Sequence, residues 1–246
     1  MPIQFLRELT SAERTAKNNI RLGVSLAFVA GAVNAGGFLA VGQYTSHMSG
    51  IVSALADNAV LGEAELVLLG LASLLCFISG AACSAMLINL GRRFETRSLY
   101  AAPLMLEATL LLCFGFLETR HGAGNAPLVV DLLCFMMGLQ NAMITKISRA
   151  EIRTTHVTGL VTDIGIELGK LAYINSKQGN ARHARVVADR TRMALLASLL
   201  SAFLTGALAG ALGFKYFGFI ASLPLVGILV LLAIVPVVDD IIGTNT

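Results

Sequence analysis

Six apolar stretches, each about 20 residues long, dominate the hydropathy pattern of the chain, and that length crosses a bilayer core as a helix. The period-two alternation that is typical of membrane β-barrels is absent. In lipid, helices then remain the structure that satisfies every backbone polar group internally. The pattern therefore predicts an all-α integral membrane protein with six transmembrane helices, at about 21–43, 64–90, 99–118, 128–146, 192–213 and 216–238.

Two further segments, 45–62 and 154–172, do not fit as ordinary spans. They are too short or too polar to cross a bilayer comfortably, yet too apolar to be plain loops. Stretches of this kind are typical of re-entrant or interfacial helices. The sequence leaves these two interpretations open.

The composition supports a membrane protein and excludes several other classes. Of the 246 residues, 56% are hydrophobic and 13% are charged, whereas a soluble domain carries roughly a quarter charged residues. We therefore exclude a water-soluble enzyme, a disordered chain and a nucleic-acid-binding module. The apolar spans make the lipid bilayer the expected partner. A net charge of +3 is too mild to imply an electrostatic partner by itself.

The distribution of basic residues predicts the orientation of the helices. If the N-terminus is cytoplasmic, all 18 lysines and arginines except Arg120 and Lys215 fall on cytoplasmic segments. Such a bias sets orientation during insertion. It predicts that both termini are cytoplasmic and that 45–62 and 154–172 lie on opposite sides of the membrane.

The two halves of the chain carry the same pair of motifs. Gly31–Ala35 and Gly138–Ala142 both read G-x-x-N-A. Thr45–Gly50 and Thr154–Gly159 both read T-[ST]-H-x-[ST]-G, and each copy holds one histidine. The motifs recur at nearly the same offset, which indicates an internal repeat.

We therefore expect two three-helix repeats, 21–118 and 128–238, after a cytoplasmic N-terminal segment, 1–20. Each repeat contains one extra short re-entrant or interfacial helix, and the whole forms a single membrane domain. An odd number of crossings inverts the second copy relative to the first. Inverted repeats recur in secondary transporters, with the ligand site near the midplane where the halves meet, although this is an analogy of fold alone.

These motifs resemble the YoaK-like family of bacterial inner-membrane proteins, which has no assigned biochemical function. The resemblance covers roughly residues 20–238 and implies the inner (cytoplasmic) membrane as the location. The family usually has an aspartate where this chain has Asn34 and an asparagine where it has Ile51. The change at Asn34 removes a titratable group, which weakens a proton-coupled mechanism at that position.

The repeated motifs hold the candidate solute-binding residues. A helix that begins at Ser46 or Thr155 would present its positive end, hydroxyls and an imidazole at one spot, which suits an anion or a polar solute. The final glycine would permit the close approach of another backbone or helix. The alternative is a capped interfacial helix whose histidine bonds a carbonyl, with the asparagines only linking helices. The candidates are Asn34, Thr45, Ser46, His47, Ser49, Gly50, Asn141, Thr154, Thr155, His156, Thr158 and Gly159.

The second copy also places four polar residues along one helix face: His156, Asp163, Glu167 and Lys170. An amphipathic helix at the cytoplasmic interface would explain this pattern. The alternative is a half-helix whose acidic residues line an aqueous vestibule, with Asp163 as a possible proton site. Charges just before the motif, including Arg153, argue against deep re-entry.

Glu107 lies within an apolar span, where a carboxylate must be protonated, paired or exposed to a water-filled cavity. We interpret it as a second possible proton site. Asp131, near the outer end of its helix, needs no special role. Gly206 and Gly210 form a G-x-x-x-G that either joins two copies as a homo-oligomer or packs tightly within one bundle.

These features favour a transporter or channel for a small polar or anionic solute or ion. A haem or metal protein with His47 and His156 as ligands is an alternative class. A lipid-binding or scaffold protein that transports nothing is another. No multi-histidine box or nucleophile motif is present, so we expect no enzyme, no metal and no cofactor.

Overall fold

The computed structural model describes residues 15–94, 96, 98–121, 126–148, 152–174 and 185–242. Within these ranges every regular element is helical, which confirms the predicted all-α class for this part of the chain. Most of the predicted segment 1–20 (residues 1–14) lies outside the description. The elements are α2 (Ala16–Val41), α3 (Met48–Leu61), α4 (Ala64–Arg93), α5 (Ala101–His121), α6 (Ala126–Ile147), α7 (Val157–Ala172), α8 (Arg190–Phe217), the 3₁₀ turn η2 (Gly218–Ala221) and α9 (Ser222–Ile242).

Four stretches of the described chain are long and apolar enough to cross a membrane, against six predicted. They are Lys17–Val41, Ala64–Arg93, Ala126–Ile147 and Arg190–Ile234. The last contains α8 and the part of α9 up to Ile234, because η2 joins the two helices without an extended break. The described side chains of α5 cover Ala101–Phe116 of its full range Ala101–His121, and this part is apolar. Multiple spanning helices are thus supported, and the count of six stays a prediction.

Local sequence explains where the first helices begin and end. The Thr15 hydroxyl accepts a hydrogen bond from the Asn18 N–H at 3.2 Å, so α2 begins at Ala16, earlier than the hydropathy pattern predicts. Gly42 ends α2 with φ 71°. Gly62 ends α3 with φ 77°, a left-handed conformation that favours glycine, and α4 begins two residues later. A two-residue link therefore folds α3 back onto α4.

Glycines bring helices from the two halves of the chain into backbone contact. Gly31 of α2 lies against the Phe203 carbonyl of α8, and Gly206 of α8 lies against the Phe28 carbonyl of α2. The α4–α6 pair repeats this reciprocity: Gly80 lies against the Phe135 carbonyl and Gly138 against the Phe77 carbonyl. A Cβ at any of these four glycines would overlap the opposing backbone. Each close pair thus joins one helix from each half.

The G-x-x-x-G of α8 packs within the chain. Gly206 and Gly210 are both buried, and Gly210 lies against the backbone of Ala32 in α2. The α2 helix therefore contacts both glycines within one chain, and association of two copies through them stays a prediction. The observed contacts of this motif are those of packing within one bundle.

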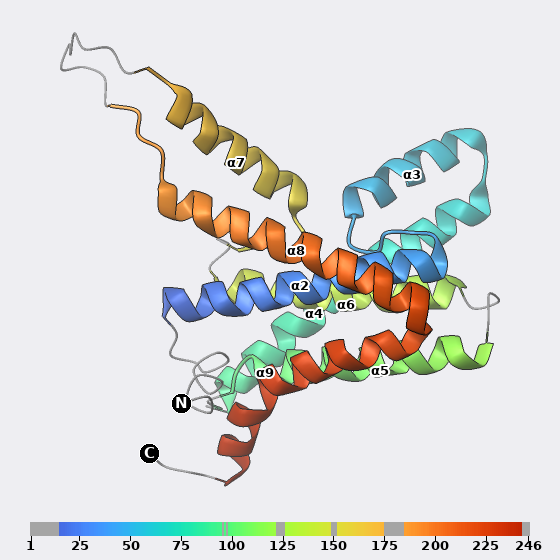
Figure 1. The fold of residues 1–246 in the computed structure, drawn as a ribbon. Coiled ribbons are helices and arrows are strands. Elements are labelled where there is room, and N and C mark those ends of the chain that lie inside the picture. Colours follow the sequence, from blue (N-terminus) through green and yellow to red (C-terminus); the bar gives the residue numbers. More distant parts are fainter. Residues whose placement is uncertain are drawn as a thin grey trace.

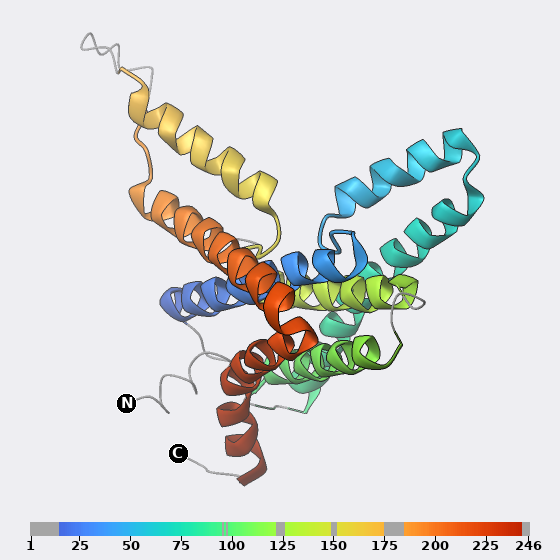
Figure 2. The ribbon, with the colours of Figure 1, turned by 45° about the vertical axis from the view of Figure 1, so that its right-hand side comes forward.

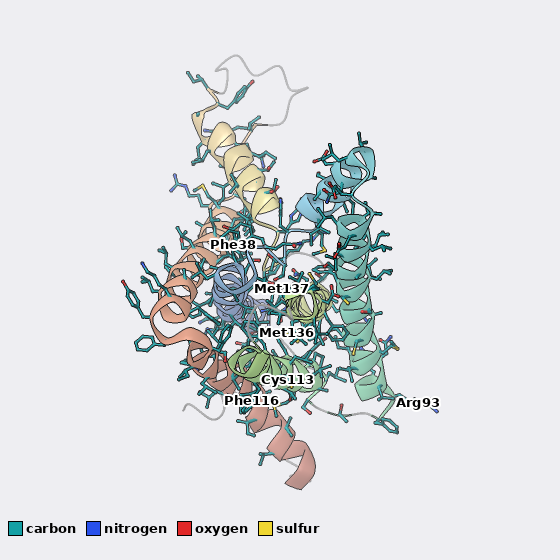
Figure 3. The ribbon with its side chains drawn as sticks, turned by 90° about the vertical axis from the view of Figure 1, so that its right-hand side faces the viewer. Phe38, Arg93, Cys113, Phe116, Met136 and Met137 are labelled. Atoms are coloured by element: carbon teal, nitrogen blue, oxygen red, sulfur yellow. The ribbon has the colours of Figure 1, made fainter. Side chains whose placement is uncertain are left out.

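The interior of the bundle centres on α6, which contacts both α2 and α4 (Figure 3). Met136 and Met137 of α6 are fully buried there. Phe116, on the rim of α5, is 67% exposed. Large apolar side chains are also exposed along α3, α4, α8 and α9. An apolar exterior of this extent is typical of helices that face lipid.

Candidate functional site

The two repeated histidines occupy the positions just before α3 and α7. His47 precedes Met48 and His156 precedes Val157, and each histidine is the N-cap of its helix. Figures 1 and 2 show the first turns of α3 and α7 near each other on one side of the bundle, about halfway along α2, and the two helices diverge from there. The fold therefore brings together two segments that are 109 residues apart in the sequence.

Each asparagine of the G-x-x-N-A motifs holds the loop that leads into its histidine. The Asn34 Oδ1 accepts hydrogen bonds from the Ser46 N–H at 3.2 Å and the Ser46 hydroxyl at 2.9 Å. The Asn141 Oδ1 accepts from the Thr155 hydroxyl at 2.9 Å. The two halves thus form the same bond between corresponding residues. A part-buried amide that pairs with a hydroxyl satisfies two groups that would be costly to leave unpaired.

This arrangement corrects the predicted role of Ser46 and Thr155. Neither residue caps a helix, since α3 and α7 begin two residues after them and no side-chain hydrogen bond caps either terminus. The hydroxyls donate to the asparagines instead. Propensity favours serine and threonine as caps, but here a tertiary partner engages them.

The glycine at the end of each motif makes room for the histidine of the same motif. A Cβ at Gly50 would overlap the imidazole of His47, and a Cβ at Gly159 would overlap the imidazole of His156. The prediction that these glycines admit another backbone or helix is therefore wrong. Each ring lies over the first turn of its own helix, in space that only glycine leaves open.

One cavity of about 780 Å³ lies between the two motif copies. We call it the central cavity. It is lined by residues of both halves, so the first turns of α3 and α7 share one space. Eight of the predicted site residues line it: Asn34, Ser46, His47, Ser49, Asn141, Thr155, His156 and Thr158.

Several lining residues of the central cavity were not predicted from the sequence. Arg153 and Thr145 add polar groups, and Tyr44, Phe77 and Phe203 add aromatic surface. Thr145 lies four residues after Asn141, on the same helix face, so helical periodicity could have identified it. Arg153 had been interpreted only as an obstacle to re-entry.

Two further cavities flank the central one, and each contains one of the histidines. The α3-side cavity, about 470 Å³, is lined by His47, Gly50, Ser73 and Asp131 among others. The Ser73 hydroxyl donates to Asp131 at 3.0 Å, so Asp131 is part of this lining, which the sequence interpretation missed. Because His47 also lines the central cavity, its side chain borders both spaces.

The α7-side cavity, about 700 Å³, repeats this relation in the other half. His156 lines both it and the central cavity. Gly159, Asp163 and Arg192 are also in its lining. The two flanking cavities thus use corresponding residues of the repeat, histidine and glycine, but different charged groups.

Ionic contacts fix α7 against the start of α8. Asp163 pairs with Arg192 at 2.9 Å. Glu167, buried although it is ionisable, accepts from Lys170 at 2.8 Å and from the Asp189 N–H at 2.8 Å. The Lys170 hydrogen bond, followed by the bond from the Asp189 backbone, holds the pKa of the Glu167 carboxyl below its usual range. The predicted polar face of α7 therefore turns toward α8.

The remaining predicted site residues lie away from the three cavities. Thr45 and Thr154 are fully buried, and their hydroxyls have no partner among the described residues. Glu107 is fully buried in α5, and neither carboxyl oxygen has a partner in the described part of the chain. None of the three belongs to the lining of these cavities. A role for Glu107 as a proton site stays a prediction.

The described residues contain no group of three or more His, Cys, Asp or Glu that could hold a metal ion. The central cavity offers two imidazoles, and its other polar lining consists of hydroxyls, amides and one guanidinium. Hydroxyls, amides and a guanidinium are typical of a solute site, whereas a dedicated zinc site takes four Cys, His or carboxylate ligands.

Comparison with known proteins identifies the family of the chain. The profile of a protein family of unknown function, DUF1275, matches residues 22–235. The UPF0700 transmembrane protein RA0705 of Rhizobium meliloti is 29% identical over 172 residues, which cover 70% of this chain and 71% of the relative. No solved structure matches. The resemblance to a membrane-protein family of unassigned function is thereby confirmed: the chain belongs to the DUF1275 family.

Proposed function

We propose that this protein passes a small polar or anionic solute across the membrane, as a transporter or channel, through the central cavity. One observation carries the proposal: both copies of the histidine motif line a single cavity, and each histidine also borders a second cavity on its own side. Three spaces in this order would form a path, with one imidazole at each junction.

The proposal includes six crossing helices in two inverted triplets, α2, α4 and α5 followed by α6, α8 and α9. The contacts between helices support it, because they occur in matching pairs. The pair α2–α8 corresponds to α6–α4, the pair α3–α4 corresponds to α7–α8, and α5 packs on α9. A two-fold relation between the halves would generate this set of contacts.

The positions of the basic residues support the same topology. In Figure 1, α2 and α8 begin, and α4, α6 and α7 end, toward the same side of the bundle. Lysine or arginine occurs at each of these ends. Only Lys215 is placed near the opposite end of a described helix, and the side chain of Arg120 lies outside the description. Under the positive-inside rule we assign the basic side to the cytoplasm of a bacterial inner membrane, with both termini on that side.

We interpret α3 and α7 as half-helices that begin near the midplane. The exposure of α7 favours this over an interfacial helix. Its polar face packs against α8, where Glu167 is 2% exposed, whereas Val161, Ile166 and Leu168 are each about half exposed. A helix resting on the membrane surface would turn its polar face to water. An apolar outer face with a polar inner face suits a helix that enters lipid beside a wet cavity.

In this proposal the first turns of α3 and α7 replace the water around the solute. Hydroxyls at Ser49 and Thr158, the amide nitrogen of Asn34, and the first N–H groups of the two helices are available for hydrogen bonds. The Asn141 amide is instead bonded to Thr155 and to the Met137 carbonyl. Rocking of one half against the other would open the path first at one histidine and then at the other.

Flux into proteoliposomes tests the proposal. The probes are the potassium salts of chloride, nitrate and formate and the neutral solutes urea and glycerol, each followed by light scattering. His47→Ala with His156→Ala should lower the flux of the conducted probe at least about tenfold and leave folding and insertion intact, since both junctions lose their side chain. Thr162→Ala, an exposed position on α7 that bonds only its own helix, is the matched control.

Two results would contradict the proposal. One is that wild-type vesicles pass none of the probes faster than empty liposomes. The other is that the double variant, inserted and monodisperse, conducts at the wild-type rate. A haem Soret band in the purified protein would instead support the histidine-ligand alternative.

A further inference from the structure

We infer that the central cavity selects a small oxyanion, a carboxylate or an inorganic oxyanion, and that Arg153 supplies the charge that binds it. This inference rests on the proposed function and adds to it a substrate class and a binding residue. Arg153 lies three residues before His156, in the segment that leads into α7.

The charge of the central cavity has one sign. Among its lining residues Arg153 is the one fixed charge, and neither aspartate nor glutamate is present. Arg153 also lines the α7-side cavity, so it stands where that space meets the central one. Arg153 is exposed, and the acidic residues near it, Asp163 and Asp189, line the α7-side cavity and not the central one. Within the central cavity its charge attracts anions and disfavours cations.

Arg153 differs from the neighbouring cations in having no acidic partner among the described residues. Arg192 is paired with Asp163 at 2.9 Å, and Lys170 is paired with Glu167 at 2.8 Å. No salt bridge within the described part of the chain involves Arg153. Its guanidinium is therefore available to a ligand, and its planar fork matches the two oxygens of a carboxylate or similar oxyanion.

The neutral groups of the cavity also present donors to a ligand. The Asn34 and Asn141 side-chain oxygens are already occupied by Ser46 and Thr155, which leaves the Asn34 amide nitrogen as its free polar group. The Ser49 and Thr158 hydroxyls stand at the second residue of α3 and α7. Both asparagine oxygens thus accept bonds within the protein, while the Asn34 amide nitrogen and the two hydroxyls can donate to an anion.

The volume fits a small anion that keeps part of its hydration. A cavity of about 780 Å³ is in the range of small-molecule sites, and a water molecule occupies about 30 Å³. A formate, nitrate or phosphate ion would therefore share the cavity with water. Hydroxyls and amides would bind that water in both halves.

The test compares Arg153→Gln and Arg153→Lys with the wild-type protein. The probes are potassium nitrate, formate and phosphate, with potassium chloride, whose anion is not an oxyanion, used to keep ionic strength constant. Flux is measured in proteoliposomes, and binding is measured as the rise in melting temperature of the protein in detergent. Arg185→Gln is the matched control, because it removes a cation from an exposed position outside the three cavities.

We expect Arg153→Gln to lower oxyanion flux and apparent affinity about ten- to a hundredfold, as loss of a charge-assisted hydrogen bond does. Arg153→Lys should retain part of both, because it keeps the charge but loses the fork. In both Arg153 variants the melting temperature without anion should equal that of the wild type. If the wild type also conducts a neutral probe, the variants should conduct it at the same rate.

The outcomes separate this inference from the proposed function. If Arg153→Gln and the wild type show the same oxyanion flux and the same rise in melting temperature with oxyanion, the role of Arg153 is overturned. Wild-type flux of urea or glycerol, with none of nitrate, formate or phosphate, would overturn the anion assignment and leave the passage intact. Absence of flux for every probe would overturn both.

Discussion

The helices α3 and α7 begin with the same motif but are held in place by different means. A two-residue link joins α3 to α4, and Leu55 packs over Gly70 of α4. The connection from α7 to α8 runs over residues 173–189, and Asp163 and Glu167 bond to the start of α8 instead. One ion pair and one hydrogen bond to the backbone thus hold α7 against α8, whereas a short loop holds α3 against α4.

The starts of the two helices, in contrast, are alike in detail. Both have the asparagine–hydroxyl bond, the histidine N-cap without a side-chain cap, and the glycine beneath the ring. The contacts that hold α3 and α7 to their neighbouring helices differ, whereas the structures of their first turns are the same. This agreement supports the proposal that the first turns and the central cavity carry the function.

The largest expected effect on stability comes from the glycines at the α2–α8 and α4–α6 contacts, where helices of the two halves touch. Gly138→Ala and Gly31→Ala each place a Cβ against an opposing carbonyl. Backbone cannot move aside as a flexible side chain does, so each should destabilise the protein by about 3 kcal/mol or more. Melting temperature and monodispersity in detergent measure the effect.

Gly227→Ala in α9 is the control for these glycines, since a Cβ there meets open space. If the two helix pairs are equivalent, Gly31→Ala and Gly138→Ala should lower the melting temperature to similar extents. A large effect in one pair and none in the other would contradict their equivalence.

Asn34→Ala and Asn141→Ala should have the next largest effect, because each leaves a partly buried hydroxyl without its partner. We expect a loss of about 1–3 kcal/mol in each half. Double-mutant cycles with Ser46→Ala and Thr155→Ala measure the coupling. Additive effects within either pair would show that its hydrogen bond does not hold the loop.

Acidification should loosen α7 and leave α3 unchanged. The folded-state pKa of Glu167 is lowered, so its contribution is present at neutral pH and is lost as pH falls through that lowered value. A spin label at Ile174, beyond the end of α7, should gain mobility in acid, whereas a label at Val60 of α3 should not. Glu167→Gln should give the mobile spectrum at neutral pH. Equal response at both ends would refute the difference in support.

The smallest effect on stability is expected from Gly50→Ala and Gly159→Ala. Each new Cβ overlaps an imidazole that can rotate away, so the melting temperature should change little, by the equivalent of about 1 kcal/mol or less. Flux should nevertheless change, because the ring leaves its position at the cavity junction. Wild-type flux in both variants would argue against the histidines as the residues that separate the cavities.

Hydropathy and the repeat predicted much of this arrangement from sequence. Apolar length identified the long helices, and the two exceptional segments became α3 and α7. The matched motifs identified eight residues of the central cavity. Such features are local, since composition and spacing determine them.

What the sequence did not predict depends on contacts between distant residues. The hydroxyl of Ser46 bonds to Asn34 rather than capping α3, because the amide is brought within reach only by folding. The position of Arg153 at the cavity likewise follows from the approach of α7 to α3, so its charge was interpreted as an obstacle when it is part of the lining. Gly31 meets the backbone of Phe203, which lies 172 residues further along the chain, and spacing alone does not specify this pairing.

The central claim is that α3 and α7 start at one shared space and diverge from it. Electron–electron distance measurements in lipid nanodiscs test it most directly. Spin labels go at Ser49 with Thr158 and, in a second sample, at Val60 with Ile174, after the free cysteines Cys76, Cys83, Cys113 and Cys134 are replaced. At 1.5 Å rise per residue, the outer pair should be longer than the inner pair by about 20 Å or more. Equal distances for the two pairs, or a longer distance for the inner one, would contradict the account.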